Sequence, residues 1–171
     1  AQAEGKVERR LKQVEMTWDA AVLQFVPYPG TGGATDETIY WLSSPDDTLE
    51  QLDEHLLVLQ STVASVSASA EDVDPASELG QWSVDFKARL DRWLGMLSDV
   101  DTTLRLWVEA QRLWSSMEGI FMGSADVRSA LPDDIKRFET ADAEFKELLK
   151  DAQVEGRIVV ACVGQARIEH L

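Results

Sequence analysis

The glycine-rich stretch PGTGGATD, residues 29–36, is the segment whose residue types come closest to phosphate-binding chemistry. A P-loop requires a lysine and then a serine or threonine after its last glycine, and a dinucleotide-binding loop would require a glycine where Thr35 stands. The stretch meets neither requirement. Because clusters of proline and glycine mark turns, we interpret it as the turn of a β-hairpin and expect no cofactor-binding residue in it.

The sequence contains two histidines, His55 and His170, and one cysteine, Cys162. Neither histidine lies in an HExxH motif or at a metal-ligand spacing from the cysteine. A cysteine nucleophile needs a base and an electropositive setting, whereas Cys162 lies in the apolar run VVACVG of an acidic chain. We therefore expect no metal ligand and no nucleophile, and we assign Cys162 to packing.

Adjacent carboxylates occur at Asp46 with Asp47 and at Asp133 with Asp134. Such pairs could act as an acid and a base in catalysis. Both pairs, however, stand where a helix is expected to begin, and negative charge is favourable at a helix N-terminus without any catalytic role. The sequence thus predicts no catalytic residue.

Composition excludes several partners. The 171 residues include 31 Asp and Glu against 16 Lys and Arg, a formal charge of −15 that repels nucleic acid and anionic membrane surfaces. The apolar runs are far shorter than the ~20 residues of a membrane span, and the polar first residues do not resemble a signal peptide. With a single cysteine the sequence allows no internal disulfide, and without asparagine it allows no N-linked glycosylation. Both facts fit a reducing compartment. We expect an intracellular chain, cut from something longer.

The spacing of apolar residues and the turn residues between them predict two helices and a hairpin over residues 5–67. A helix is expected over residues 5–25 and a hairpin over 23–42, followed by a helix over 45–67 that Ser44 caps and in which Pro45 takes the first position. The first helix is expected to bury one face at steps of three and four: Val7, Leu11, Val14, Trp18, Val22 and Phe25.

A long helix is predicted over residues 76–119, since its apolar stripe keeps heptad-like steps and no proline interrupts it. Four of the six tryptophans lie on this stripe, which favours a core seam over an exposed partner-binding face. Gln111 is the polar member of the stripe, and it could either fix the packing register or point to a wet edge. The stripe comprises Trp82, Phe86, Leu90, Trp93, Leu97, Val100, Leu104, Trp107, Gln111 and Trp114.

The chain then turns. Gly123 is placed to end the long helix, Ser124 to cap a short helix over 124–130, and Pro132 to open a helix over 132–152. A C-terminal helical segment, broken near Gly156 and Gly164, follows. The predicted fold class is all-α, a helical bundle with one long heptad-patterned helix and a small β-hairpin.

Several ordered motifs resemble the linker region of dynein heavy chains, N-terminal region 2. They are the W-x-x-x-Q-x-x-W arrangement of Trp107, Gln111 and Trp114, then EGIF at 118–121, GSADVR at 123–128, LP at 131–132 and RF at 137–138. The upstream hairpin and helix and the downstream VVACVGQARIEHL also resemble this family, so the resemblance spans nearly all of residues 1–171. The chain departs from the family pattern at residues 115–117, where SSM replaces a more aromatic, leucine-rich stretch.

The resemblance implies that the chain is part of an elongated linker arm of a microtubule motor, possessing no enzyme activity of its own. ATP and magnesium would then belong to a downstream ring of the parent motor. The partners it implies are that ring, other dynein chains and, only indirectly, the microtubule, in the cytoplasm or in the axoneme of a cilium or flagellum. The alternative is a spectrin-like helical scaffold or tether, because periodicity alone does not separate the two.

Overall fold

The computed structural model describes residues 2–30 and 38–163. Within these residues the fold is all-α with one small antiparallel hairpin, which confirms the predicted class. The elements in chain order are α1 (Gln2–Ala20), β1 (Phe25–Pro27), β2 (Tyr40–Leu42), α2 (Asp46–Ala70), α3 (Glu78–Gly123), α4 (Ala125–Ala130), α5 (Pro132–Glu155) and α6 (Ile158–Cys162).

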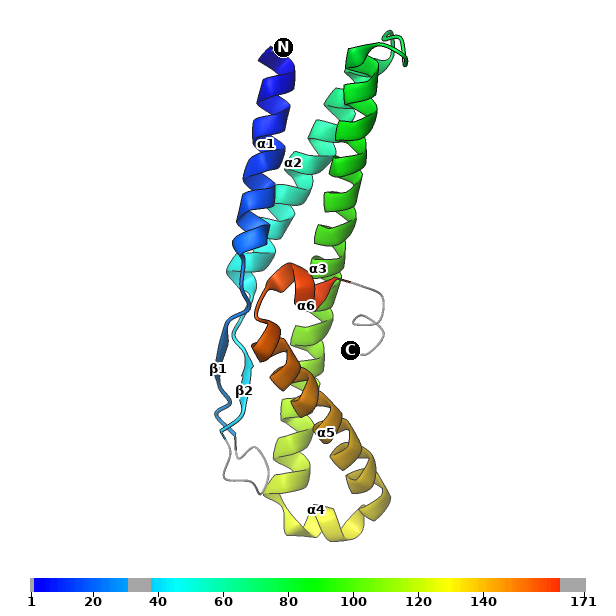
Figure 1. Cartoon of the computed structure of the whole chain (residues 1–171). Coiled ribbons are helices and arrows are strands. Elements are labelled where there is room, and N and C mark those ends of the chain that lie inside the picture. The colour runs from blue at the N-terminus through cyan, green and yellow to red at the C-terminus, as the bar shows by residue number, and fades with distance from the viewer. Residues whose placement is uncertain (1, 31–37, 164–171) are drawn as a thin grey trace.

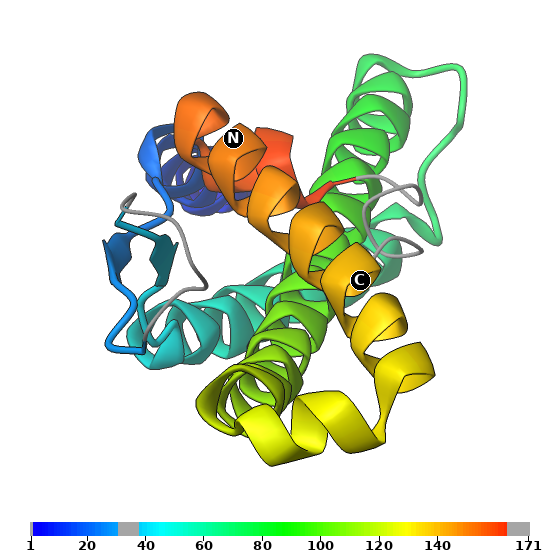
Figure 2. The same ribbon diagram turned by 90° about the horizontal axis from the view of Figure 1, so that it is seen from below.

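The 46-residue helix α3 is the long axis of the molecule. Figure 1 shows α1 and α2 beside its first half, the hairpin and α5 beside its second half, and α6 between the two groups. Seen from below, the hairpin and α5 reach α3 from different sides (Figure 2). The other helices and strands that the structure describes are therefore arranged around this one helix.

The core follows the predicted stripe of α3. Trp93, Trp107 and Trp114 are buried, which supports the core-seam interpretation, while Trp82 is only half-buried at the edge. The Ser77 side chain accepts a hydrogen bond from the Gly80 N–H at 3.0 Å and so caps the helix start. The stripe runs through Phe86, Leu90, Trp93, Leu97, Val100, Leu104, Trp107, Gln111, Trp114 and Glu118.

The first helix ends earlier than the predicted 5–25, at Ala20. Beyond it the backbone pairs with the junction between α5 and α6: the Leu23 N–H donates to the Gly156 carbonyl at 2.7 Å, and the Ile158 N–H donates to the Ala21 carbonyl at 3.0 Å. Val22, expected on the buried helix face, is 54% exposed. These long-range backbone bonds replace the helical ones that periodicity predicts.

Phe25, also expected on that helix, begins β1 instead. The register pairs Phe25 with Leu42, Val26 with Trp41 and Pro27 with Tyr40. The hairpin was expected over residues 23–42, and each of its two strands has only three residues. Most of the glycine-rich turn, residues 31–37, lies outside the described residues.

The prediction that Ser44 caps α2 is wrong. Pro45 itself occupies the position before the helix, no side chain caps it, and α2 runs from Asp46 to Ala70 rather than over 45–67. At the bend, Ser124 does cap α4 by accepting from the Val127 N–H at 3.4 Å. No helix in the described ranges is both long enough and apolar enough to cross a membrane.

The long helix and α5 both extend further than expected. α3 continues to Gly123 instead of ending near 119, and α5 continues to Glu155 instead of 152. Pro132 does lie in the first turn of α5. Gly156 ends that helix with φ of 72°, a left-handed conformation that favours glycine.

Candidate functional site: the face of the long helix that binds the hairpin and α5

The described histidine and cysteine, whose types could support catalysis or metal binding, make hydrogen bonds that join elements of the fold. His55 lies on α2, and its Nδ1 accepts a hydrogen bond from Trp18 Nε1 at 2.9 Å. An accepting nitrogen requires a neutral ring, and burial lowers the pKa of His55. Cys162 is buried, and its carbonyl accepts a hydrogen bond from Thr103 Oγ1 at 2.9 Å. His170 lies outside the described residues.

The two pairs of adjacent carboxylates do not meet. Asp46 and Asp47 are exposed in the first turn of α2, and Asp133 and Asp134 are exposed in the first turn of α5. Among the described residues, no group of three or more His, Cys, Asp or Glu side chains is placed to hold a metal ion. The arrangement that stands out is instead a polar and aromatic face in the second half of α3.

Gln111 fastens the hairpin to α3 by its side-chain amide. Its Nε2 donates to the Leu42 carbonyl at 2.8 Å, and its Oε1 accepts from the Leu42 N–H at 3.0 Å. The amide thus pairs with Leu42 as the backbone of a further strand would. Of the two roles left open by the sequence, the structure shows a buried register residue, and its partner is a strand rather than another helix.

Tyr28, one residue beyond β1, forms the second attachment of the hairpin. Its hydroxyl donates to Glu118 Oε2 at 2.8 Å and lies 3.2 Å from Ser115 Oγ. Burial, assisted by the Glu118 carboxylate, raises the pKa of Tyr28, whereas the contact with Ser115 lowers it. Its ring lies 4.7 Å from the ring of Trp114, centroid to centroid.

Trp114 joins the hairpin to α5. On one side its ring packs against Tyr28 and Trp41, and on the other its centroid lies 5.2 Å from that of Phe145. Its Nε1 donates to Asp142 Oδ1 at 2.8 Å, and Asp142 also pairs with Lys146 at 2.8 Å. One indole therefore contacts β2, the residue that follows β1, and α5.

Trp107 completes this surface. It is fully buried, and its ring centroid lies 6.2 Å from that of Phe25 in β1. Its Nε1 has no hydrogen-bond partner within the described part of the chain. We call Trp107, Gln111, Trp114 and Glu118 the hairpin-binding face, since all four lie on the buried stripe of α3 and all but Trp107 bind the hairpin or α5 through polar groups.

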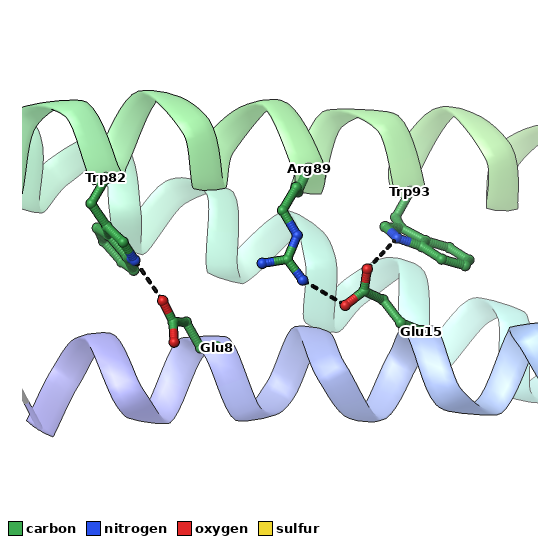
Figure 3. A network of polar contacts seen from close by, with 5 residues as sticks. All are labelled: Glu8, Glu15, Trp82, Arg89 and Trp93. Carbon is green, nitrogen blue, oxygen red and sulfur yellow. Dashed lines mark hydrogen bonds and ion pairs between the residues drawn. The ribbon is translucent and has the colours of Figure 1, made fainter.

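A second polar cluster fastens α1 to the first half of α3 (Figure 3). Trp82 Nε1 donates to Glu8 at 2.6 Å, Trp93 Nε1 donates to Glu15 at 2.9 Å, and Arg89 pairs with Glu15 at 2.6 Å. Bonds to ionised carboxylates are stronger than bonds between neutral groups. α1 is thus held to α3 by long side chains that reach across to its carboxylates.

Sequence reasoning found the spacing of the hairpin-binding face but not its partners. Glu118 and Tyr28 were not singled out as a pair, because they are 90 positions apart. The available signal was a glutamate on the apolar stripe of α3, one step beyond Trp114. A carboxylate at a core position demands a hydrogen-bond partner, and a hairpin tyrosine can supply one.

Comparisons of the sequence with known proteins identify its family. The family model described as dynein heavy chain, N-terminal region 2, matches residues 1–171. Dynein axonemal heavy chain 9 of Homo sapiens is 35% identical over 147 residues, which cover 86% of this chain and 3% of that protein. The dynein beta chain of the flagellar outer arm of Chlamydomonas reinhardtii is 30% identical over 171 residues, 100% of this chain and 3% of that protein. The ciliary dynein beta chain of Tripneustes gratilla is 30% identical over 162 residues, 95% of this chain and 3% of that protein. The chain therefore spans a small fraction of the length of these relatives.

Proposed function

We propose that this chain, which belongs to the family of dynein heavy chain N-terminal region 2, is a mechanical linker segment of a microtubule-based motor. In this proposal it acts as a lever, transmitting conformational change from the ATP-hydrolysing ring of the parent motor toward the tail and cargo. The names of the relatives favour an axonemal dynein of a cilium or flagellum. ATP and magnesium would act in the ring, elsewhere in the parent polypeptide.

The observation that carries this proposal is the uninterrupted helix α3. Its 46 residues correspond to about 70 Å at ~1.5 Å per residue. An isolated helix of that length bends easily, so stiffness has to come from neighbours packed along it. α1 and α2 support its first half, and the hairpin and α5 support its second half.

The two polar clusters add resistance to sliding. Apolar side chains alone resist separation of two helices better than they resist small shifts along the axis, because the hydrophobic effect is not directional. The hydrogen bonds of Gln111 to Leu42 and of Glu15 to Trp93 have fixed geometry. They hold neighbouring elements in one register, as a force-bearing element requires.

The test interrupts α3 in the intact motor. A short Gly-Ser segment inserted between Leu97 and Ser98 removes helical hydrogen bonds and rotates every later residue of the buried stripe out of register. We expect ATP turnover to persist while microtubule gliding velocity and stall force fall, because the arm flexes instead of moving its cargo end. ATPase rate and gliding speed are measured on the same preparation.

The matched control inserts the same segment between Glu71 and Asp72, in the turn that joins α2 to α3. This change lengthens a surface connection without interrupting the rod, so gliding velocity should stay near the parent value. If the Leu97 insertion folds and gliding speed is unchanged, α3 bears no force, and the spectrin-like tether becomes the better description.

A further inference from the structure

Beside its buried stripe, α3 carries a second apolar stripe that faces away from the core. Its members follow one another at alternating steps of four and three, the heptad spacing at which helices pack together. Leu113 is 47% exposed and Ile120 is 55% exposed. Because the members lie on successive turns of one helix, they form a continuous patch rather than isolated apolar residues. They are Leu106, Ala110, Leu113, Met117 and Ile120.

Part of this stripe forms one wall of a groove between α3 and α5. The groove has a volume of about 270 Å³. Buried Trp114 and Leu148 lie at its base, so its floor is apolar and already well packed. Such a surface fits the apolar face of a helix laid along it. The lining residues are Ala110, Leu113, Trp114 and Met117 of α3 and Ala141, Glu144, Phe145 and Leu148 of α5.

The α5 edge of the groove is acidic. Glu144 lines the groove and is exposed. Helical spacing places the exposed Glu147 one turn beyond Glu144 and the exposed Asp151 two turns beyond it, along the same edge. Arg137 is the one described cation at this spacing. On α3, outside the groove lining, Glu109 and Arg112 pair with each other at 2.6 Å.

We propose that this groove binds an amphipathic α-helix of another protein, one with apolar residues at heptad spacing and lysine or arginine along the flank that meets α5. The apolar stripe supplies the packing, and the acidic edge selects the charge and the orientation. A second copy of this chain is the wrong occupant, because it would bring two acidic edges together on chains of formal charge −15 each. The proposal goes beyond the mechanical function and does not depend on it.

The test uses two synthetic helical peptides of about three heptads each, identical in their apolar stripe. One carries lysines on its flank and the other carries glutamates. Binding of each labelled peptide to the chain is measured by fluorescence anisotropy. We expect the lysine peptide to bind at least about tenfold more tightly than the glutamate peptide.

Three variants locate the site. The double variant Leu113→Gln with Met117→Gln keeps the charge of the chain and should weaken binding of the lysine peptide at least about tenfold. Val84→Gln, on the same helix but far from the groove, should leave the affinity unchanged; Val84 is 61% exposed. Glu144→Lys should narrow the preference for the lysine peptide, a readout that does not depend on the apolar substitutions.

Other results would overturn the proposal. If neither peptide binds, or if the double variant binds the lysine peptide as well as the parent does, the groove is not the site. If light scattering shows a dimer that the double variant abolishes and the lysine peptide does not displace, the occupant is a second copy of the chain. Melting temperatures of all variants establish that each is folded.

Discussion

A buried glutamine side chain can satisfy both polar groups of one backbone residue, and Gln111 does so for Leu42. Replacing Gln111 with Leu introduces an apolar side chain of similar size but leaves the Leu42 N–H and carbonyl without this partner. An unsatisfied buried polar group costs about 1–3 kcal/mol, so we expect the free energy of unfolding to fall by about 2–4 kcal/mol. Chemical denaturation measures the change.

The control for this substitution is Ser116→Leu, because Ser116 is an exposed position on the same helix. It introduces the same side chain without removing a buried hydrogen bond, so stability should change by less than about 0.5 kcal/mol. Equal stability losses in the two variants would mean that the Gln111 amide makes no specific contribution.

His55 gives the fold a pH dependence of defined sign. Burial lowers its folded-state pKa, against a smaller opposing effect of Glu54. A lowered histidine pKa means that the folded state prefers the neutral ring, so this contribution to stability is fully present above the ordinary pKa of about 6.5 and is lost as the pH falls below it. The lost contact is the hydrogen bond that Nδ1 accepts from Trp18.

The variant His55→Asn isolates this effect, since the asparagine amide oxygen can accept from Trp18 and does not titrate. We expect the parent to lose more stability than His55→Asn between pH 7 and pH 5, in paired thermal melts. Carboxylates titrate in both proteins, so only the difference between them reports on His55. Parallel curves for the two proteins would contradict a half-buried histidine that the folded state keeps neutral.

At the scale of the element, two glycines of α3 have opposite surroundings. A Cβ added at Gly95 would meet no atom within 4 Å, whereas one at Gly80 would lie 2.3 Å from the Asp74 carbonyl oxygen and 2.9 Å from the Pro75 Cα. Gly95→Ala should therefore stabilise the chain by about 1 kcal/mol through helix propensity. Gly80→Ala should destabilise it, because backbone atoms must shift to admit the methyl group.

Measured together, the two substitutions test whether the α2–α3 turn is fixed against the helix start. Both add one methyl group to one helix, so propensity alone predicts the same gain for both. Urea denaturation of the two variants gives the comparison. A gain at Gly80 equal to that at Gly95 would show that the turn moves aside freely.

Element type followed from the sequence where the controlling contacts are local. The 3–4 stripe from Phe86 to Trp114 indicated α3, and the residue pattern Ser124 to Pro132 indicated the α4 bend and the start of α5. Prediction failed at Val22 and Phe25, whose helical spacing continues the α1 pattern. The backbone on either side of Val22 bonds instead to Gly156 and Ile158, and Phe25 pairs with Leu42 in the hairpin. Contacts across so many positions leave no periodic signal in either segment.

The candidate site was predictable to the same degree. Trp107, Gln111 and Trp114 stood out because their spacing is local. Their roles in the site come from contacts to Leu42, Tyr28 and Asp142. These contacts depend on how the chain folds back. A glutamine on an apolar stripe predicts that a buried partner exists, but it does not identify that partner.

At the scale of the whole molecule, the core is one continuous cluster that extends along α3 from Phe86 to Trp107 and out to Leu148 and Leu149 of α5. The tip, where α3 passes through α4 into α5, lies outside this cluster. α4 has no buried residue, and the tip is joined mainly by the stacked rings of Phe121 and Phe138, with centroids 5.4 Å apart. The fold thus has a densely packed core along most of α3 and a less tightly packed end.

Native-state hydrogen exchange should resolve this difference. Amides of residues 90–107 should exchange only through global unfolding, because opening them would expose the shared core. Amides of residues 119–123 and of α4 should exchange through local opening, at a lower free energy.

Phe138→Ala removes one of the stacked rings and should speed exchange at the tip, while residues 90–107 should respond only as far as global stability changes. Leu148→Ala, which acts on the shared core, should instead speed exchange throughout α3. Equal protection of the tip and of residues 90–107 in the parent protein would contradict this prediction and would show that the tip is as stable against opening as the core of α3.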